Sequence, residues 1–351
     1  MLPARLPGLC ARPLAPDMHL PDSIARWLKP STWNYAAQRL DFGLVLPLIA
    51  RLPLRWAYRV SNWRGAINAR FARDWTELSV GSPFMGGRCA AAYRELFPQA
   101  SDTEIQKLVV QRYQTTTREE LVAVLAIQGR LDKIDWDMDS FRQALAQRQA
   151  GRGLVVVVSH FDNFFLGMIG IARCGQPVHT MKSDIVQDPR VHPTLRKFFH
   201  VKYQRYEEAM GGVPFLTYGA AARDAFHRVL NQGGIVVMAS DGPASQGEHK
   251  GTWVSWMGKQ RKMADGAVRM AIDTGSQIVG MRSPYAKLGR VVAQWSEMID
   301  PQDFHMHDPV RTRELIYAPI FAFLESGIRA DPGLWWASHL LGDFEVRDEQ
   351  V

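Results

Sequence analysis

The sequence predicts an α/β fold in which a mixed, mostly parallel central sheet is flanked by helices. Two apolar runs, residues 153–160 ("GLVVVVSH") and 234–241 ("GIVVMASD"), begin at glycine and lack polar alternation, which is typical of strands buried on both faces. Helical patterns alternate with these runs. The chain has 351 residues, of which 46% are hydrophobic and 22% charged, so it can bury a large core.

The first 150 residues predict helices. Residues 1–17 are rich in Pro and Arg and lack the apolar core of a signal peptide, so we expect a disordered extension. We expect residues 18–150 to form a helical N-terminal region that packs on the core and on a membrane surface. Within it, Ser101 and Glu104 form a capping box that begins a long helix over 101–127, and a further helix is predicted over 139–150.

Residues 42–60 resemble a segment that lies in a membrane interface. Three arginines and two prolines interrupt their apolar residues, so the segment is too broken for a span of roughly 20 apolar residues. The alternative is a buried, kinked pair of helices. The 11 Trp and the net charge of +7 favour anionic partners, such as a membrane surface, an acidic carrier protein or a phosphorylated substrate.

Residues 151–345 predict the α/β core, and residues 346–351 a short tail. Further strands are expected over 176–183, 213–218, 277–283 and 290–299, and helices over 221–234, 264–275 and 312–331. The three widely spaced cysteines predict neither a disulfide framework nor a zinc cluster. No nucleotide-binding glycine motif, serine-hydrolase elbow or nucleic-acid-binding module is present.

His160 follows the valine run directly. Because open α/β sheets bind ligands beyond the carboxyl ends of their strands, this position suits a general base. The alternative is a structural histidine that caps the next helix. Asp241 stands at the same place after the second apolar run.

Several motifs, taken in order, resemble the lipid A biosynthesis late acyltransferase (lauroyl/myristoyl acyltransferase) family of the lysophospholipid acyltransferase superfamily. The matching stretches cover about residues 40–345 and are "VVVVSHFDNF", Gly233-Gly234 with the strand to Asp241, "GTWVSWMG", the helix over 266–275 and "PGLWWASH". The resemblance implies transfer of a fatty acyl chain from a thioester donor to a hydroxyl or amine acceptor. The donor would be acyl carrier protein or coenzyme A. The enzyme would be peripheral on the cytoplasmic face of the inner membrane, with no metal or permanently bound cofactor.

This chain departs from that family's His-x-x-x-x-Asp/Glu motif, because Phe165 stands where the acidic residue belongs. A carboxylate normally fixes the tautomer of such a histidine and stabilises its imidazolium. Three alternatives remain open: Asp162 curls back to His160, Asp241 reaches it from the other strand, or a nucleophilic amine acceptor needs no orienting acid. The stretch "HTMKSD", His179 to Asp184, also has the family's spacing, but about one such match is expected by chance and it lies one strand later than the motif should.

We therefore expect His160, Asp162 and Asp241 to be the catalytic candidates. The residues expected to contact substrate are Ser159, Phe161, Asn163, Phe165, Gly242, Lys259, Arg261, Trp336 and His339. Lys259 and Arg261 would contact an anionic donor, or would form an ordinary solvated loop. The alternative function, which Phe165 favours, is a catalytically inactive acyltransferase-like protein that binds a lipid or carrier protein as the partner of another enzyme.

Overall fold

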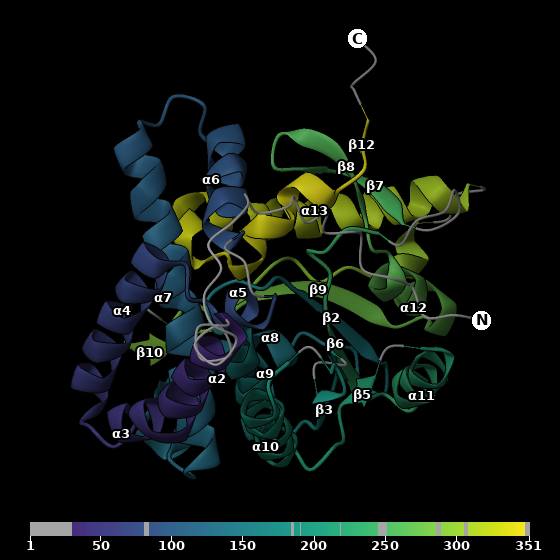
Figure 1. Ribbon diagram of the computed structural model, residues 1–351. Helices are drawn as coiled ribbons and strands as arrows, with labels where there is room; N and C mark the ends of the chain where they lie inside the picture. Colours follow the sequence, from purple (N-terminus) through teal and green to yellow (C-terminus); the bar gives the residue numbers. More distant parts are fainter. Residues whose placement is uncertain are drawn as a thin grey trace.

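The largest sheet of the computed structural model contains five strands in the order β11-β9-β2-β6-β3 (Figure 1). β2 (Leu154–Val158) pairs in parallel with β6 (Ile235–Ala239) and with β9 (Gln277–Arg282). β3 (Val178–His179) is parallel to β6, and β11 (Gln294–Trp295) is antiparallel to β9. The structure describes residues 30–80, 84–183, 186–189, 191–217, 219–244, 251–285, 289–304 and 308–347, and the expected extension over 1–17 lies outside them. The predicted α/β class is confirmed.

Every residue of β2 is buried, which explains why its sequence shows no polar alternation. Side chains alternate between the faces of a strand. Val155 and Val157 accordingly belong to one apolar cluster, and Leu154, Val156 and Val158 to another. The two clusters lie on opposite faces of the sheet.

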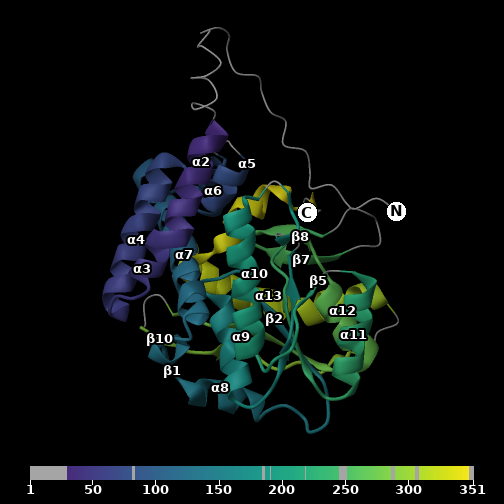
Figure 2. The same ribbon diagram turned by 60° about the horizontal axis from the view of Figure 1, so that its bottom comes forward.

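Helices cover both faces (Figure 2). The cluster with Val155 includes residues of α11 (Ala220–Asn231), α12 (Gly266–Thr274) and α13 (Pro309–Ala330). The cluster with Val156 includes residues of α8 (Met138–Leu145), α9 (Phe164–Arg173) and α10 (Pro193–Ala209). The helices expected at 139–150, 221–234, 264–275 and 312–331 are therefore present, whereas α9 and α10 were not predicted.

The N-terminal helices form one flank of the molecule in both views (Figures 1 and 2). They are α2 (Pro30–Leu40), the π-helix η1 (Asp41–Val45), α3 (Leu46–Ile49), α4 (Leu54–Phe71), α5 (Trp75–Val80), α6 (Met85–Leu96) and α7 (Asp102–Ile127). The predicted capping box of α7 is present, with Ser101 Oγ accepting from the Glu104 amide at 3.3 Å. No helix among these or the other described residues is both long and apolar enough to cross a bilayer.

A second, three-stranded sheet was not predicted. β7 (Thr252–Trp256) and β8 (Lys259–Met263) form an antiparallel hairpin, and β12 (Val346–Arg347) pairs with β8. The two residues of the turn, Met257 and Gly258, both have positive φ, at 55° and 78°, which is typical of a tight hairpin turn. The remaining short elements are η2 (Leu131–Lys133), β1 (Asp135–Trp136), β4 (Met181–Lys182), β5 (Leu216–Thr217), β10 (Arg290–Val291), η4 (Pro301–Asp303), η5 (Pro332–Leu334) and η6 (Trp336–Asp343). The strands expected at 176–183 and 290–299 are thus each divided in two.

A close contact between α4 and α7 holds two long helices of the N-terminal flank together. Gly65 of α4 makes this contact possible, since a Cβ at this position would come within 2.5 Å of the Gln114 Cα. Close by, Thr117 Oγ1 donates to the Ser61 carbonyl at 2.8 Å. Both helices therefore approach closely enough for side chain and backbone to pair.

Gly65→Ala should lower the free energy of unfolding by about 1–3 kcal/mol, because the added methyl group would force the two helix backbones apart. Urea denaturation measures the change. Gly87→Ala is the matched control, since Gly87 lies in α6 with no atom within 4 Å of a Cβ. There the substitution should stabilise by up to about 1 kcal/mol through helix propensity. Equal stabilities of the two variants would contradict the close contact.

Candidate active site

The chain leaves β2 and turns sharply at His160. The His160 carbonyl accepts from the Trp336 amide at 2.8 Å, and the Asp162 amide donates to the Leu334 carbonyl at 2.8 Å. Asp162 has a positive φ of 50°, so the backbone is irregular here, and α9 begins only at Phe164. The C-terminal segment around residues 334–336 thereby holds the His160 loop from outside the sheet.

Asp241 binds His160 at the carboxyl ends of two adjacent parallel strands. Asp241 Oδ1 lies 2.7 Å from His160 Nδ1, and Oδ2 accepts from the His160 amide at 2.8 Å. Trp335 Nε1 donates to the same Oδ2 at 2.8 Å. Of the three alternatives that the sequence left open, the structure therefore shows a carboxylate from the other strand end beside His160.

The charges of this pair reinforce each other. Burial disfavours the charged imidazolium, but the charge of Asp241 and its hydrogen bond outweigh that effect, so the pKa of His160 lies above its ordinary value. The charge of Glu119 acts in the same direction. Burial likewise disfavours ionisation of Asp241, but His160 and the Trp335 hydrogen bond hold the pKa of this carboxyl below its usual range. Asp241 is thus ionised near neutral pH.

The other ring nitrogen of His160 is the one available for chemistry. When Nδ1–H donates to Asp241, the neutral ring carries its lone pair on Nε2. Phe164 contacts the ring edge-on at 4.9 Å between centroids, and Trp336 lies at 5.4 Å. The side chain is still 29% exposed. The imidazole is therefore held by apolar rings without being enclosed.

Asp162 is engaged at another strand end. Its Oδ2 accepts from the Tyr285 amide at 2.7 Å, which attaches the His160 loop to the segment after β9. Because Nδ1 of His160 binds Asp241, Asp162 is not the group that orients the ring. The alternative in which Asp162 curls back to orient His160 is therefore not the arrangement observed, and any other catalytic role of Asp162 stays a prediction.

Phe165 lies on α9 and packs in a cluster of aromatic side chains. Its ring contacts Tyr206 at 4.8 Å and Phe215 at 6.2 Å, and Lys202 Nζ lies 5.0 Å from its centroid. Lys202 in turn pairs with Glu119. Phe165 is 9% exposed, so it fills space in the core, and its expected direct contact with substrate does not follow from its position.

Three buried polar atoms next to His160 lack a hydrogen-bond partner among the described residues. They are Ser159 Oγ and both side-chain polar atoms of Asn163, whose residues are 1% and 2% exposed. Unpaired buried polar groups are uncommon and call for an explanation. Both residues are closed off from solvent, so their expected contact with substrate stays a prediction. Gly242, beside Asp241, has open space where a Cβ would lie. Phe161 is buried and forms an isolated antiparallel β-bridge with Trp335.

The "WWASH" element lies at the His160 loop. The Trp336 ring lies tilted beside His160, and the Trp336 carbonyl lies 3.3 Å from His339 Nδ1. Burial and the nearby Arg112 charge lower the pKa of His339 to about 3, so this ring stays neutral. Sequence analysis selected Trp336 and His339 but missed Trp335, which binds Asp241; the only signal was the doubled tryptophan.

Lys259 and Arg261 lie in β8 and not in a solvated loop. Arg261 is 1% exposed, pairs with Glu95 and donates to the Trp256 carbonyl at 3.2 Å. Lys259 Nζ lies 2.8 Å from Glu95 Oε1. The Arg261 cation is buried against Glu95 and is not accessible to an anionic donor, whereas the Lys259 side chain is 49% exposed, so its contact with a donor stays a prediction.

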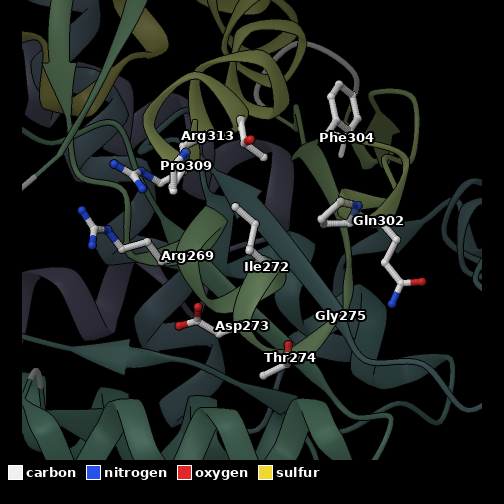
Figure 3. A pocket seen from close by; sticks show the side chains of 11 residues that line it. Arg269, Ile272, Asp273, Thr274, Gly275, Gln302, Phe304, Pro309 and Arg313 are labelled. Atoms are coloured by element: carbon white, nitrogen blue, oxygen red, sulfur yellow. The ribbon is translucent and has the colours of Figure 1, made fainter. Parts of the chain in front are cut away.

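Two other features do not contribute to this site. His179 ends β3, and Asp184 lies outside the described residues. A hollow of about 680 Å³ lies between α12 and α13, and Figure 3 shows the side chains that line it. Two of them, Arg269 and Arg313, pair with Asp265. Gly275 lines the hollow just before β9 begins, so it opens at the amino end of the parallel strands, away from His160. In the described part of the chain, no three His, Cys, Asp or Glu side chains are grouped to hold a metal ion.

Asp241→Asn should lower the pKa of His160 below 6.5, because burial then acts without the opposing carboxylate charge. A titration of histidine ring protons by NMR measures this pKa. His179, whose pKa burial also lowers, serves as an internal control and should titrate unchanged. A His160 pKa that stays above 6.5 in the variant would exclude Asp241 as its dominant partner.

Comparison with known proteins does not assign the chain to a family. No protein-family model matches the chain, and its sequence matches no curated protein.

Proposed function

We propose that this protein is an acyltransferase that moves a fatty acyl chain from a thioester donor to a hydroxyl or amine acceptor, with His160 as general base. In this proposal the mostly parallel five-stranded sheet is the central catalytic sheet, and the helical N-terminal region is membrane-proximal. The observation that carries the proposal is the pair of hydrogen bonds between Asp241 and His160. A buried ionised carboxylate that holds one nitrogen of a partly exposed imidazole is the arrangement that base catalysis requires.

The chemistry follows from the two ring nitrogens. Nε2 of His160 accepts the proton of the acceptor hydroxyl or amine as its oxygen or nitrogen bonds to the thioester carbonyl carbon. Asp241 stabilises the imidazolium that forms. The tetrahedral intermediate then collapses, the carbon–sulfur bond breaks, and the imidazolium returns the proton to the departing thiolate. The products are an acylated acceptor and a free thiol.

The donor is the acyl thioester of a carrier protein or of coenzyme A, and the enzyme acts at the cytoplasmic face of the inner membrane. Both statements extend from the family resemblance. The unpaired Asn163 amide and Ser159 hydroxyl beside His160 suit polar recognition of the acceptor or the thioester.

The rival function is an inactive binding partner of another enzyme, and Phe165 was its support. Phe165 does not leave His160 without a carboxylate partner, because Asp241 already binds Nδ1. A purely structural Asp241 explains its three hydrogen bonds but not the partial exposure of the His160 ring, whose side chain is 29% exposed. The site geometry therefore favours the enzyme.

His160→Ala should abolish acyl transfer, and Asp241→Asn should reduce the rate by about 10⁴-fold, as expected for loss of an orienting carboxylate. The assay incubates purified protein with acyl carrier protein or coenzyme A thioesters and a lipid extract, and follows thiol release and product mass. His227→Ala is the matched control, because His227 lies on α11 and outside the site. Unchanged turnover in His160→Ala refutes the mechanism, and a wild-type protein that neither transfers nor hydrolyses any donor supports the binding partner.

Phe165→Glu should not raise the transfer rate, although it restores the resembled family's motif. Nδ1 is already bound by Asp241, and a carboxylate at 165 would be desolvated inside the aromatic cluster. We expect a less stable protein with equal or lower activity, measured by thermal unfolding and the same thiol assay. A gain in activity would show that Asp241 does not serve as the catalytic orienting group.

A further inference from the structure

The exposed apolar side chains are concentrated on one flank. Of 13 large hydrophobic side chains that are exposed in the described part of the chain, ten lie between Trp33 and Phe71. Nine of these residues belong to α2, η1, α3 and α4, and Leu52 lies in the turn between α3 and α4; these elements lie together in both views (Figures 1 and 2). A concentration of this kind marks a surface that meets another apolar body.

On α4, tryptophan and arginine alternate along the exposed side. Trp56, Arg59, Trp63 and Arg70 follow one another at intervals of three, four and seven, which places them on one helix face. Trp56 and Trp63 are 47% and 67% exposed, and the Arg59 guanidinium lies 5.0 Å from the Trp56 ring. Tryptophan and arginine together are typical of the boundary between lipid and water.

A second exposed row runs along the preceding helices. Trp33, Leu40, Leu44 and Leu48 recur at helical spacing across α2, η1 and α3, and are 65%, 56%, 51% and 49% exposed. A soluble surface rarely presents three leucines at this spacing to water. We call the ten exposed residues of the two rows and their neighbours the docking face: Trp33, Tyr35, Leu40, Leu44, Val45, Leu48, Leu52, Trp56, Trp63 and Phe71.

The charge of the docking face is of one sign. Between residues 33 and 73 the chain has seven arginines and one carboxylate, Asp41, which pairs with the buried Arg64. The other six arginines, Arg39, Arg51, Arg55, Arg59, Arg70 and Arg73, are exposed. An apolar surface that carries six exposed arginines, none of them with a carboxylate partner among the described residues, is complementary to an anionic lipid surface, not to another copy of itself.

A groove opens between this flank and α10. It has a volume of about 750 Å³, and its walls come from α2, η1 and α3 on one side and from α7 and α10 on the other. Leu40 and Leu44 belong both to the groove and to the docking face. The lining includes two cations, Arg39 and Lys197, and no carboxylate.

Ring contacts continue from the groove toward the candidate active site. Phe42 and Phe198, which line the groove, meet at 5.0 Å, and Phe198 contacts Phe199 at 5.5 Å. From there Tyr203, Phe215, Phe165 and Phe164 form successive contacts that end at His160. The groove and His160 therefore lie at the two ends of one continuous series of contacting aromatic side chains.

We propose that the docking face binds a bilayer containing anionic phospholipid, and that the groove takes one such lipid, with an acyl chain along Leu40 and Leu44 and the phosphate between Arg39 and Lys197. The inference rests on the membrane-proximal part of the proposed function and is independent of the chemistry at His160.

Vesicle flotation tests the docking face with the full chain. Wild-type protein should bind vesicles of phosphatidylcholine with phosphatidylglycerol at least about tenfold more tightly than phosphatidylcholine alone, as unopposed arginines require. Trp56→Ala with Trp63→Ala should weaken binding by about tenfold or more, whereas Ile272→Ala with Val310→Ala, exposed apolar residues elsewhere, should not. His160→Ala should bind as wild type, which separates this inference from the acyl-transfer proposal.

Absence of wild-type binding to either kind of vesicle would overturn the docking face, and so would binding by the double tryptophan variant that equals that of wild type. A third contradicting result would be a concentration-dependent dimer of the wild-type protein that the double tryptophan variant alone fails to form. Sedimentation equilibrium detects the dimer.

The groove is tested with a soluble short-chain phosphatidylglycerol. Arg39→Ala with Lys197→Ala should weaken its binding by about tenfold, because two cations near one phosphate are removed. Lys107→Ala with Arg228→Ala removes the same charges from exposed positions outside the groove and should leave binding unchanged. Binding that is equal in all three proteins, or absent in the wild type, would overturn the groove as a lipid site.

Discussion

The arrangement around Asp241 is the constraint on which the rest of the site depends. Its carboxylate is fully buried and accepts from the His160 ring, the His160 amide and Trp335. These three donors come from the end of β2 and from the segment before η6, which are far apart in sequence. Desolvating a charge is costly unless it is paired and hydrogen-bonded. The loop after β2, the end of β6 and the C-terminal segment must therefore come together for any of them to be stable.

The sequence predicted the strands that carry this arrangement because their burial on both faces leaves a simple signature. The uninterrupted valines of β2 and the matching run of β6 placed His160 and Asp241 at equivalent strand ends. Whether the two strands are neighbours depends on the strand order, which no local pattern encodes, so Asp241 remained one of three alternatives. Trp335 could not be selected, since its partner is 94 residues away. The hairpin β7-β8 was missed because its glycine turn and basic second strand resembled a loop.

Residues 42–60 show a different limit of sequence reasoning. Helical periodicity identifies an apolar face but not what that face contacts. One face of α4 is buried against α7 through Ser61 and Gly65, while Trp56 and Trp63 point outward. The prediction of a buried helix pair therefore describes one side of the segment, and the proposed membrane contact concerns the exposed side. Only the packing of α7 shows which residues belong to which side.

The replacement of the acidic residue by Phe165 becomes intelligible when both sides of α9 are considered. A histidine at a strand end has one ring nitrogen to be held and one to react, so it needs a single orienting carboxylate. Asp241 supplies that group from β6. Position 165 therefore does not need a carboxylate, and Phe165 packs against Tyr206 and Phe215 in the aromatic cluster that extends to the groove beside α10. The residue that stands in place of the resembled family's acid thus joins the buried ring contacts that run from the groove to the ring of His160.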